Sequence, residues 1–278
     1  MRVRLLACLE IIRPHNMLAA ALGVAAGFHV AGGGALQPLV PAALLAALAT
    51  GAGNVINDYF DFAIDRVNKP RRPLPSGRLS PRAALAWYAA LAVITTAVAL
   101  VGVSGAVLVV VLAWEVLLFL YAAFLKRTWV AGNVTVAVVA ASAFLAGGLA
   151  AGRPETSAVP MAVAFAFVMC RELIKGGEDL EGDSAAGVRT LAAIAGRERT
   201  ACISACAMLA VAALIPLPSV AGLFGGRYLA VMVCLVTPVL MTGALAVVRR
   251  PERPVFGRVS RGLKLAMFAG IVAIALGV

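Results

Sequence analysis

The sequence predicts an all-α, polytopic membrane protein, a single bundle of nine transmembrane helices around a polar cavity. Of its 278 residues, 62% are hydrophobic and 13% are charged, whereas soluble domains are nearer half apolar and a quarter charged. The apolar runs are roughly 20 residues long, the length that crosses a bilayer as a helix. They are continuous and do not alternate with period two, which excludes a β-barrel. No long polar insert divides the chain, so we expect one membrane-embedded domain over residues 1–278.

Nine apolar segments are separated by glycine, proline and charged residues. The segment before Pro14 is short and carries charges, so we expect an uncleaved first span and no signal peptide. The nine predicted spans cover residues 15–32, 38–60, 83–103, 105–125, 131–151, 157–175, 200–217, 228–248 and 263–278.

Lysine and arginine are distributed unevenly between the loops. With the N-terminus in the cytoplasm, 22 of the 24 fall on that side, and only Arg153 and Arg227 fall outside. Cytoplasmic loops of membrane proteins carry such an excess, so the net charge of +11 does not indicate a nucleic-acid partner. We expect a multi-pass protein of the cell membrane, with its N-terminus, cavity mouth and active site on the cytoplasmic side.

Acidic residues gather at two places on this predicted inner side. In "NDYFDFAID", Asp58, Asp61 and Asp65 follow the second span. If the helix continues, they share one stripe of about 100° with Asn54 and Asn57. Polar groups at lipid-facing positions cost several kcal/mol, so this stripe is expected to face a polar cavity.

The second acidic stretch, "RELIKGGEDLEGD", follows the sixth span. Asp179 and Asp183 are one helical turn apart, and Glu172 shares their face if the helix continues through Gly176 and Gly177. Both stretches lie on the same predicted side of the membrane. The alternative is that these carboxylates only pair with neighbouring Arg and Lys at solvated helix ends.

Carboxylate and amide oxygens one turn apart are the hard ligands that Mg²⁺ prefers. Mg²⁺ usually takes one or two carboxylates together with substrate phosphates, and clustered carboxylates repel one another unless cations neutralise them. Two acidic clusters on one side therefore suit a magnesium clamp for a diphosphate, whose apolar tail would lie among the helices.

The motifs resemble, in order, those of the UbiA-type intramembrane prenyltransferases. "NDYFDFAID" and "EDLEGD" are similar to the first and second acidic motifs of that family. "RPHN" at 13–16 is similar to the opening of its first helix, and "YAAFLKR" at 121–127 to the end of its fourth. The resemblance runs from about residue 11 to 200. It implies Mg²⁺-dependent transfer of a prenyl group from a polyprenyl diphosphate to an acceptor.

The resemblance also implies roles for single residues. Asn57, Asp61, Asp179 and Asp183 match metal-binding positions, and Asp61, Asp179 and Asp183 would act in catalysis. Asp58 and Asp65 match further acids that bind or orient the metal. Candidates for contacting the diphosphate or acceptor are Asn16, Arg66, Lys69, Arg71, Tyr121, Lys126, Glu172 and Lys175.

Other interpretations stay open for several of these residues. The basic residues would also serve membrane topology and attract anionic lipid headgroups. Asn16 would also cap a helix, and Tyr121 would also anchor at the membrane interface. Glu115, within an apolar run, is either functional or a neutral, hydrogen-bonded carboxyl.

The acceptor is the least defined part of the prediction. "VNKPRRPLPSGRLS" and "GVRTL" are most similar to enzymes that geranylgeranylate geranylgeranylglyceryl phosphate in archaeal ether-lipid synthesis. Those enzymes often carry an acid after the lysine, where this chain has Gly176 and Gly177. Prenyltransferases that act on homogentisate or chlorophyllide have a similar sequence motif in this loop, so an aromatic or tetrapyrrole acceptor is the alternative. A secondary transporter would place ionisable groups near the midplane, whereas these acids lie at helix ends.

Overall fold

The computed structural model describes residues 2–278, and for residues 2–4 the backbone alone. Throughout this range the chain is helical, with no strand, so the all-α prediction is confirmed. Contacts divide the chain into two compact units, Met1–Ser157 and Ala158–Val278, called here the N-terminal and C-terminal units. The single membrane domain over residues 1–278 stays a prediction.

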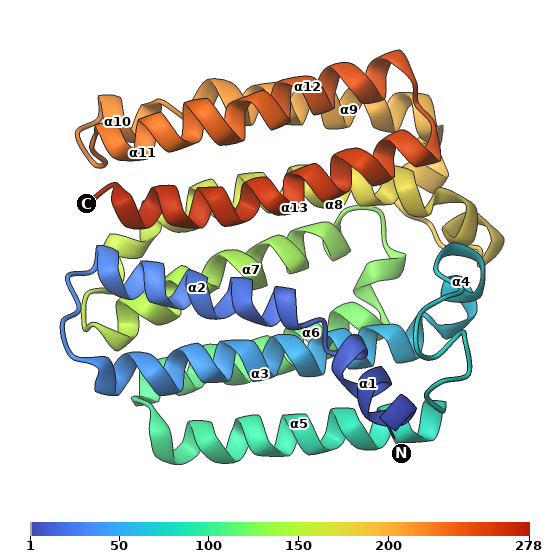
Figure 1. Ribbon diagram of the computed structural model, residues 1–278, viewed down its shortest axis with the longest axis horizontal. Helices are drawn as coiled ribbons and strands as arrows, with labels where there is room; N and C mark the ends of the chain where they lie inside the picture. The colour runs from blue at the N-terminus through green and yellow to red at the C-terminus, as the bar shows by residue number, and fades with distance from the viewer. Residues whose placement is uncertain (1) are drawn as a thin grey trace. The chain divides into compact units, whose positions relative to one another are not determined.

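The N-terminal unit is organised around α3, which packs against α2, α5 and α6 (Figure 1). Helix α7 packs against α2 and α6. The unit consists of α1 (Arg2–Ile11), α2 (Pro14–Val30), α3 (Leu36–Phe60), α4 (Phe62–Asn68), α5 (Pro81–Gly102), α6 (Gly105–Ala123), the 3₁₀ turn η1 (Leu125–Arg127), α7 (Ala131–Ala150) and the 3₁₀ turn η2 (Pro154–Ser157).

Glycine allows α2 and α7 to pack closely. A Cβ on Gly27 would lie 2.2 Å from the carbonyl oxygen of Phe144, and one on Gly147 would lie 2.1 Å from that of Val24. No side chain fits at either position, because backbone atoms of the facing helix occupy the space. Small residues that permit such close approach are frequent between membrane helices.

The C-terminal unit pairs α8 with α9 and α13, and α12 with α9 and α13. Within α9, Gly196 has φ 79° and interrupts the helical path. The unit consists of α8 (Ala158–Ala185), α9 (Leu191–Leu214), α10 (Leu217–Val220), α11 (Gly226–Val231), the π-helical turn η3 (Met232–Val236), α12 (Thr237–Arg249) and α13 (Arg253–Leu276).

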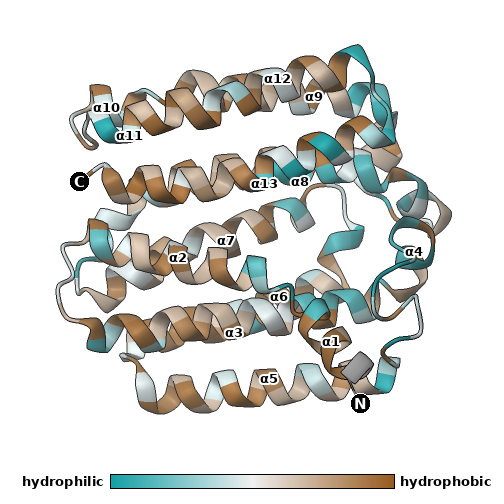
Figure 2. Cartoon of the chain, viewed as in Figure 1, coloured by the Kyte–Doolittle hydropathy of each residue, from teal (hydrophilic) through white to brown (hydrophobic). Residues whose placement is uncertain are grey.

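Eight helical segments of the described chain are long and apolar enough to cross a membrane. The first predicted span falls on α2, which qualifies only together with Leu5–Ile11 as a pair bent by 46°. The count of nine therefore stays a prediction. Large apolar side chains such as Val101 (88% exposed) and Leu265 (73% exposed) cover the outside, as expected for lipid contact. Figure 2 shows apolar residues along the helices and hydrophilic residues gathered at helix ends.

Three predicted spans leave out a long stretch at one end of the helix on which they fall. Span 157–175 stops ten residues before the end of α8, span 200–217 begins nine residues after the start of α9, and span 263–278 begins ten residues after the start of α13. Hydropathy detects the part of a helix that suits hydrocarbon, whereas the backbone hydrogen bonds of a helix continue into charged sequence. The second acidic stretch is consequently helical throughout, including Gly176 and Gly177.

Candidate functional site: two acidic clusters

The first acidic cluster, Asp58, Asp61 and Asp65, lies where α3 gives way to α4 in the N-terminal unit. The three residues are only 2%, 3% and 4% exposed. Charged carboxylates are almost never buried to this degree unless they are paired. Their partners therefore decide what this site can do.

The predicted stripe of polar residues assumed an uninterrupted helix, and that assumption is wrong at one residue. Asp61 has φ −83° and ψ 2° and separates α3 from α4. Helix-type hydrogen bonds nevertheless continue across it, because its N–H donates to the Asn57 carbonyl over 2.9 Å and Asp65 N–H donates to its carbonyl over 2.7 Å. The register is largely kept, so the acids remain close together.

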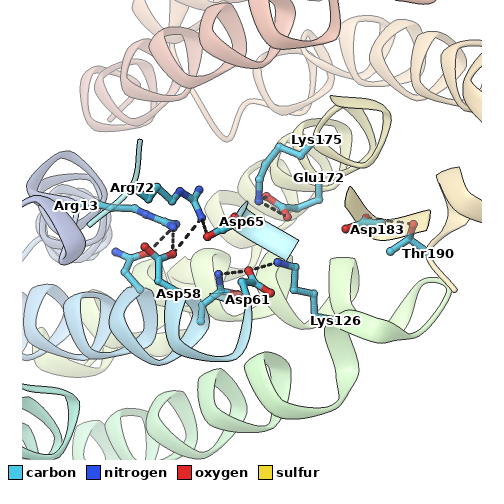
Figure 3. A network of polar contacts seen from close by, with 12 residues as sticks. Arg13, Asp58, Asp61, Asp65, Arg72, Lys126, Glu172, Lys175, Asp183 and Thr190 are labelled. Carbon is cyan, nitrogen blue, oxygen red and sulfur yellow. Dashed lines mark hydrogen bonds and ion pairs between the residues drawn. The ribbon is translucent and has the colours of Figure 1, made fainter. Parts of the chain in front are cut away.

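Two arginines from other segments neutralise Asp58 and Asp65 (Figure 3). Arg72 Nη1 lies 3.1 Å from Asp58 Oδ1 and 2.6 Å from Asp65 Oδ2. Arg13 Nη2 is ion-paired with the same Asp58 oxygen. Neither arginine can be assigned to the site from the sequence, because both stand among many basic residues on the predicted inner side. The single available signal for Arg13 was its place in the "RPHN" motif.

Arg13 lies at the break between α1 and α2. Its φ of 52° is the only positive value among the described non-glycine residues, a conformation that costs free energy and persists only where surrounding contacts hold it. Those contacts come from α3: Asn54 donates to the Ile12 carbonyl over 2.9 Å, and Asn16 donates to Asn54 Oδ1 over 3.4 Å. Asn16 therefore binds α3, and the alternative of a helix cap is wrong, since the N-cap position is Arg13.

Asp61 has a different set of partners. Asn57 Nδ2 donates to Asp61 Oδ2 over 2.8 Å, and Lys126, in the η1 turn after α6, is ion-paired with the same oxygen. The Asn57 Oδ1 atom is buried and accepts no hydrogen bond from the described residues. An unsatisfied amide oxygen one turn from a carboxylate is a donor set of the kind that suits Mg²⁺.

Within the described residues no three His, Cys, Asp or Glu side chains converge as a ready metal site. The first acidic cluster is instead neutralised by Arg13, Arg72 and Lys126. A divalent cation bound by Asn57 and Asp61 would therefore take over part of the charge balance that Lys126 supplies here. A contact between Lys126 and a phosphate in that case stays a prediction.

The pKa of the Asp65 carboxyl is shifted from its ordinary value. Burial raises the pKa of its carboxyl to about 6, although Arg72 opposes the change; the Asp61 and Asp58 charges raise the pKa further. A cation bound nearby would favour the ionised form, because metal and proton compete for carboxylate oxygens.

Three predicted phosphate-binding residues, on α4 and in the basic loop that follows it, differ in their exposure to solvent. Arg66 is exposed and lies 4.6 Å above the Phe62 ring. Lys69 is half-buried and Arg71 is exposed. Arg78, in the same loop, donates from Nη2 to Glu10 Oε1 over 2.9 Å and to the Arg71 carbonyl over 2.6 Å. Arg78 thus ties this loop to α1.

The second acidic cluster, Glu172, Asp179 and Asp183, lies on α8 in the C-terminal unit. Glu172 and Asp183 are each 4% exposed. Glu172 accepts from Arg171 Nη1 over 2.9 Å and from Lys175 Nζ over 3.0 Å, and Thr190 Oγ1 donates to Asp183 Oδ2 over 3.4 Å (Figure 3). Because α8 is continuous, Asp179 and Asp183 share a face, as predicted.

The remaining candidates lie on α6, outside both clusters. Tyr121 is half-buried near the end of this helix, and its role stays a prediction. Glu115 accepts a hydrogen bond from Thr96 Oγ1 over 2.8 Å, which agrees with the hydrogen-bonded alternative. Its second oxygen is buried without a partner among the described residues.

Comparison with known sequences identifies the family. A model of the UbiA prenyltransferase family matches residues 18–272. The chain belongs to this family. The resemblance inferred from the ordered motifs is thereby confirmed, and with it the expectation of a prenyltransferase that spans the membrane several times.

Several curated UbiA relatives match almost end to end. The chain is 40% identical over 267 residues to the digeranylgeranylglyceryl phosphate synthase of Halobacterium salinarum, with 95% of both chains covered. It is 37% identical over 268 residues to the protein of the same name from Methanopyrus kandleri, with 96% of this chain and 97% of the relative covered.

Solved structures show the same fold. A structure of digeranylgeranylglyceryl phosphate synthase in membranes matches with a TM-score of 0.74 and 27% identity, covering 100% of this chain and 99% of the other. A UbiA homolog from Archaeoglobus fulgidus bound to GPP and Mg²⁺ matches with a TM-score of 0.67 and 20% identity, covering 96% and 99%. The roles of single side chains in this UbiA family member stay predictions.

Proposed function

We propose that this protein transfers a geranylgeranyl group from geranylgeranyl diphosphate to geranylgeranylglyceryl phosphate, with Mg²⁺ as cofactor, in the synthesis of ether lipids. The observation that carries the proposal is the near end-to-end identity of about 40% to relatives named digeranylgeranylglyceryl phosphate synthase. The UbiA homolog solved with GPP and Mg²⁺ supports the diphosphate donor and the metal.

The residues assigned to the metal are Asn57 and Asp61 in the first acidic cluster, and Asp179 and Asp183 in the second. Bound there, Mg²⁺ would supply electrostatic stabilisation to the departing diphosphate. Asp58 and Asp65 orient Arg13 and Arg72, since each carboxylate is held by a guanidinium group. Asp58 and Asp65 are thus both assigned to orientation, one of the two roles that the sequence left open for them.

Lysine and arginine bind the phosphate oxygens. Lys126 lies beside Asp61 and Arg72 beside Asp65, so both cations are at hand where the donor diphosphate would bind, and charge-assisted hydrogen bonds to phosphate are strong. In the reaction the allylic C–O bond breaks, diphosphate leaves with the bonding electrons, and the acceptor hydroxyl oxygen forms the new ether bond as it loses its proton. Apolar helices keep water from the reacting carbon.

We also place the charged loops of both units on the cytoplasmic side. The proposal is supported within each unit, because the basic segments expected inside gather at one end. Arg13 and Lys126 both reach the first acidic cluster. In the C-terminal unit Arg197 at the start of α9 pairs with Glu181 near the end of α8.

The test is a transfer assay with protein purified in detergent, labelled geranylgeranyl diphosphate and Mg²⁺. Geranylgeranylglyceryl phosphate, homogentisate and a chlorophyllide are offered in separate reactions. The proposal expects label in the glyceryl phosphate product alone. Label in the aromatic or tetrapyrrole product would retain the prenyltransferase and discard the lipid acceptor.

A further inference from the structure

Two adjacent glycines precede the second acidic cluster, and their surroundings differ. A Cβ on Gly177 would lie 2.3, 2.6 and 2.5 Å from Cε1, Cζ and Cδ1 of the Phe256 ring. Atoms in ordinary contact are about 3.5–4.0 Å apart, so the ring already occupies the volume that any side chain would need. At Gly176 the nearest atom to such a Cβ is Ala192 Cβ at 3.7 Å, so an alanine fits there.

Phe256 cannot easily yield this volume. It belongs to the first turn of α13 and is fully buried, at 0% exposure. Its neighbour Gly257 faces the Glu178 side chain, whose Oε1 lies 3.4 Å from a Cβ built on this glycine. Helices α8 and α13 are thus in close contact at the turn that contains Gly177.

A third helix holds the same turn. Arg197 of α9 donates from Nε to the Gly177 carbonyl over 3.3 Å and from Nη2 to Glu181 Oε1 over 2.6 Å. Arg197 directly follows Gly196, where the helical path of α9 is interrupted. Contacts from α9 and α13 therefore meet on one turn of α8.

The position of this turn matters because Asp179 and Asp183 lie only two and six residues further along the same continuous helix. A helix moves largely as a rigid rod over so short a distance. A displacement of roughly 1 Å at Gly177, the amount by which a methyl group would be too close, would be carried to both carboxylates.

We infer that the contact between Gly177 and Phe256 sets the position of the second acidic cluster, which makes Phe256 a positioning residue for the carboxylates of Asp179 and Asp183. This inference rests on the metal-binding role proposed for those two residues. It also assigns a purpose to the second glycine of the pair, since Gly177 makes room for the ring.

The test compares Gly177→Ala with the matched control Gly176→Ala, since both replace a helical glycine by alanine. Binding of Mn²⁺ in the presence of inorganic diphosphate is followed by electron paramagnetic resonance, and the Mg²⁺ dependence of transfer is measured in parallel. We expect Gly177→Ala to weaken Mn²⁺ binding on the order of 10- to 100-fold, as loss of support around a metal site does. Gly176→Ala should leave the affinity within about two-fold, because its methyl group meets only ordinary contacts.

A rescue variant separates positioning from general damage. Leucine lacks the outer ring atoms of phenylalanine, so Gly177→Ala combined with Phe256→Leu should recover Mn²⁺ affinity to within a few-fold of wild type, roughly the tolerance of volume-conserving repacking. If the Gly177→Ala protein fails to fold, the Mn²⁺ affinity of the Phe256→Leu single variant tests the inference. We expect this variant to fold and to bind Mn²⁺ more weakly than wild type.

Equal Mn²⁺ affinity in the Gly177→Ala and Gly176→Ala variants would overturn the inference and leave the proposed function intact. Unchanged affinity in folded Phe256→Leu protein would do the same. A wild-type protein that binds no Mn²⁺ with diphosphate would instead contradict the proposed metal site, and the inference would fall with it.

Discussion

The acids of the first cluster pair with cations from other parts of the N-terminal unit, whereas Glu172 in the second cluster pairs with cations on its own helix. Arg13 and Lys126 are 45 and 65 residues away from the aspartates that they contact. Arg171 and Lys175 are one and three residues away from Glu172. Charge balance in the first cluster therefore depends on tertiary structure, whereas the two ion pairs of Glu172 with Arg171 and Lys175 follow from helix register.

This difference indicates where each cluster is sensitive. The first cluster should respond strongly to the loss of a single remote cation, because its carboxylates are buried and their ion pairs come from other segments. The second cluster should tolerate the loss of one local cation, since Arg171 and Lys175 both contact Glu172.

The largest effect is expected from removing the metal, which tests whether Lys and Arg can support prenyl transfer without it. Removing divalent cations with EDTA should abolish prenyl transfer, and excess Mg²⁺ should restore it, because the departing diphosphate needs charge stabilisation beyond that of Lys and Arg. The measurement is product formation before and after chelation. Transfer that resists EDTA would show that the basic residues alone support the reaction.

A smaller effect is expected from Lys126→Met, which removes a remote cation next to Asp61. The kcat/KM for the prenyl diphosphate should fall about 100-fold, as when one electrostatic donor to developing charge is lost. Arg127→Met is the matched control, since Arg127 is the exposed neighbour in the same turn. Equal loss in both variants would mean that general positive charge, and no specific contact, is responsible.

The two clusters can be compared directly through stability. Arg72→Ala should lower the free energy of unfolding by about 3 kcal/mol at pH 7, because it leaves buried charge unpaired. Lys175→Ala should cost about 1 kcal/mol or less, because Lys175 is partly exposed and Arg171 remains paired with Glu172. Denaturant unfolding in detergent measures both, with Arg71→Ala as the control for a basic residue in the same loop.

The pH dependence of the Arg72→Ala variant sharpens this comparison. With Arg72 present the pKa of Asp65 is about 6, and loss of this arginine, which lowers the pKa, would raise it further. At pH 5 the carboxyl of the variant is therefore neutral and leaves less unpaired charge than at pH 7. The destabilisation should therefore be smaller at pH 5 than at pH 7. A penalty that does not change with pH would assign the loss to packing of the Arg72 side chain.

The smallest effect is expected at an acid that belongs to neither cluster. Glu115→Gln keeps a hydrogen-bond acceptor for Thr96, so stability should change by about 0.5 kcal/mol or less and transfer by less than about two-fold. The check is the same pair of assays. A collapse of activity would identify a functional acid outside both clusters.

The fold class and the acidic residues could be predicted from the sequence because they depend on local patterns. Apolar runs of bilayer length indicate helices, and i, i+4 spacing places Asp179 and Asp183 on one face. Both features depend on residues close together in the chain.

The cations of the first cluster could not be assigned in the same way. Arg13, Arg72 and Lys126 reach it from three separate segments, and the topology of a membrane protein already explains an excess of basic residues. Helix ends were also misjudged, because hydropathy does not detect the charged continuation of α8. The role of Gly177 is likewise invisible without α13, since the Phe256 ring comes from 79 residues further along the chain.

The central claim is that both acidic clusters serve one reaction. Its most direct test is the transfer assay with Asp61→Asn and Asp179→Asn, each shown to be folded by its elution volume and unfolding midpoint. We expect kcat to fall in each variant on the order of 10²- to 10³-fold, as when a group that stabilises transition-state charge is lost. Wild-type turnover in either variant would contradict the claim and confine the chemistry to the other cluster.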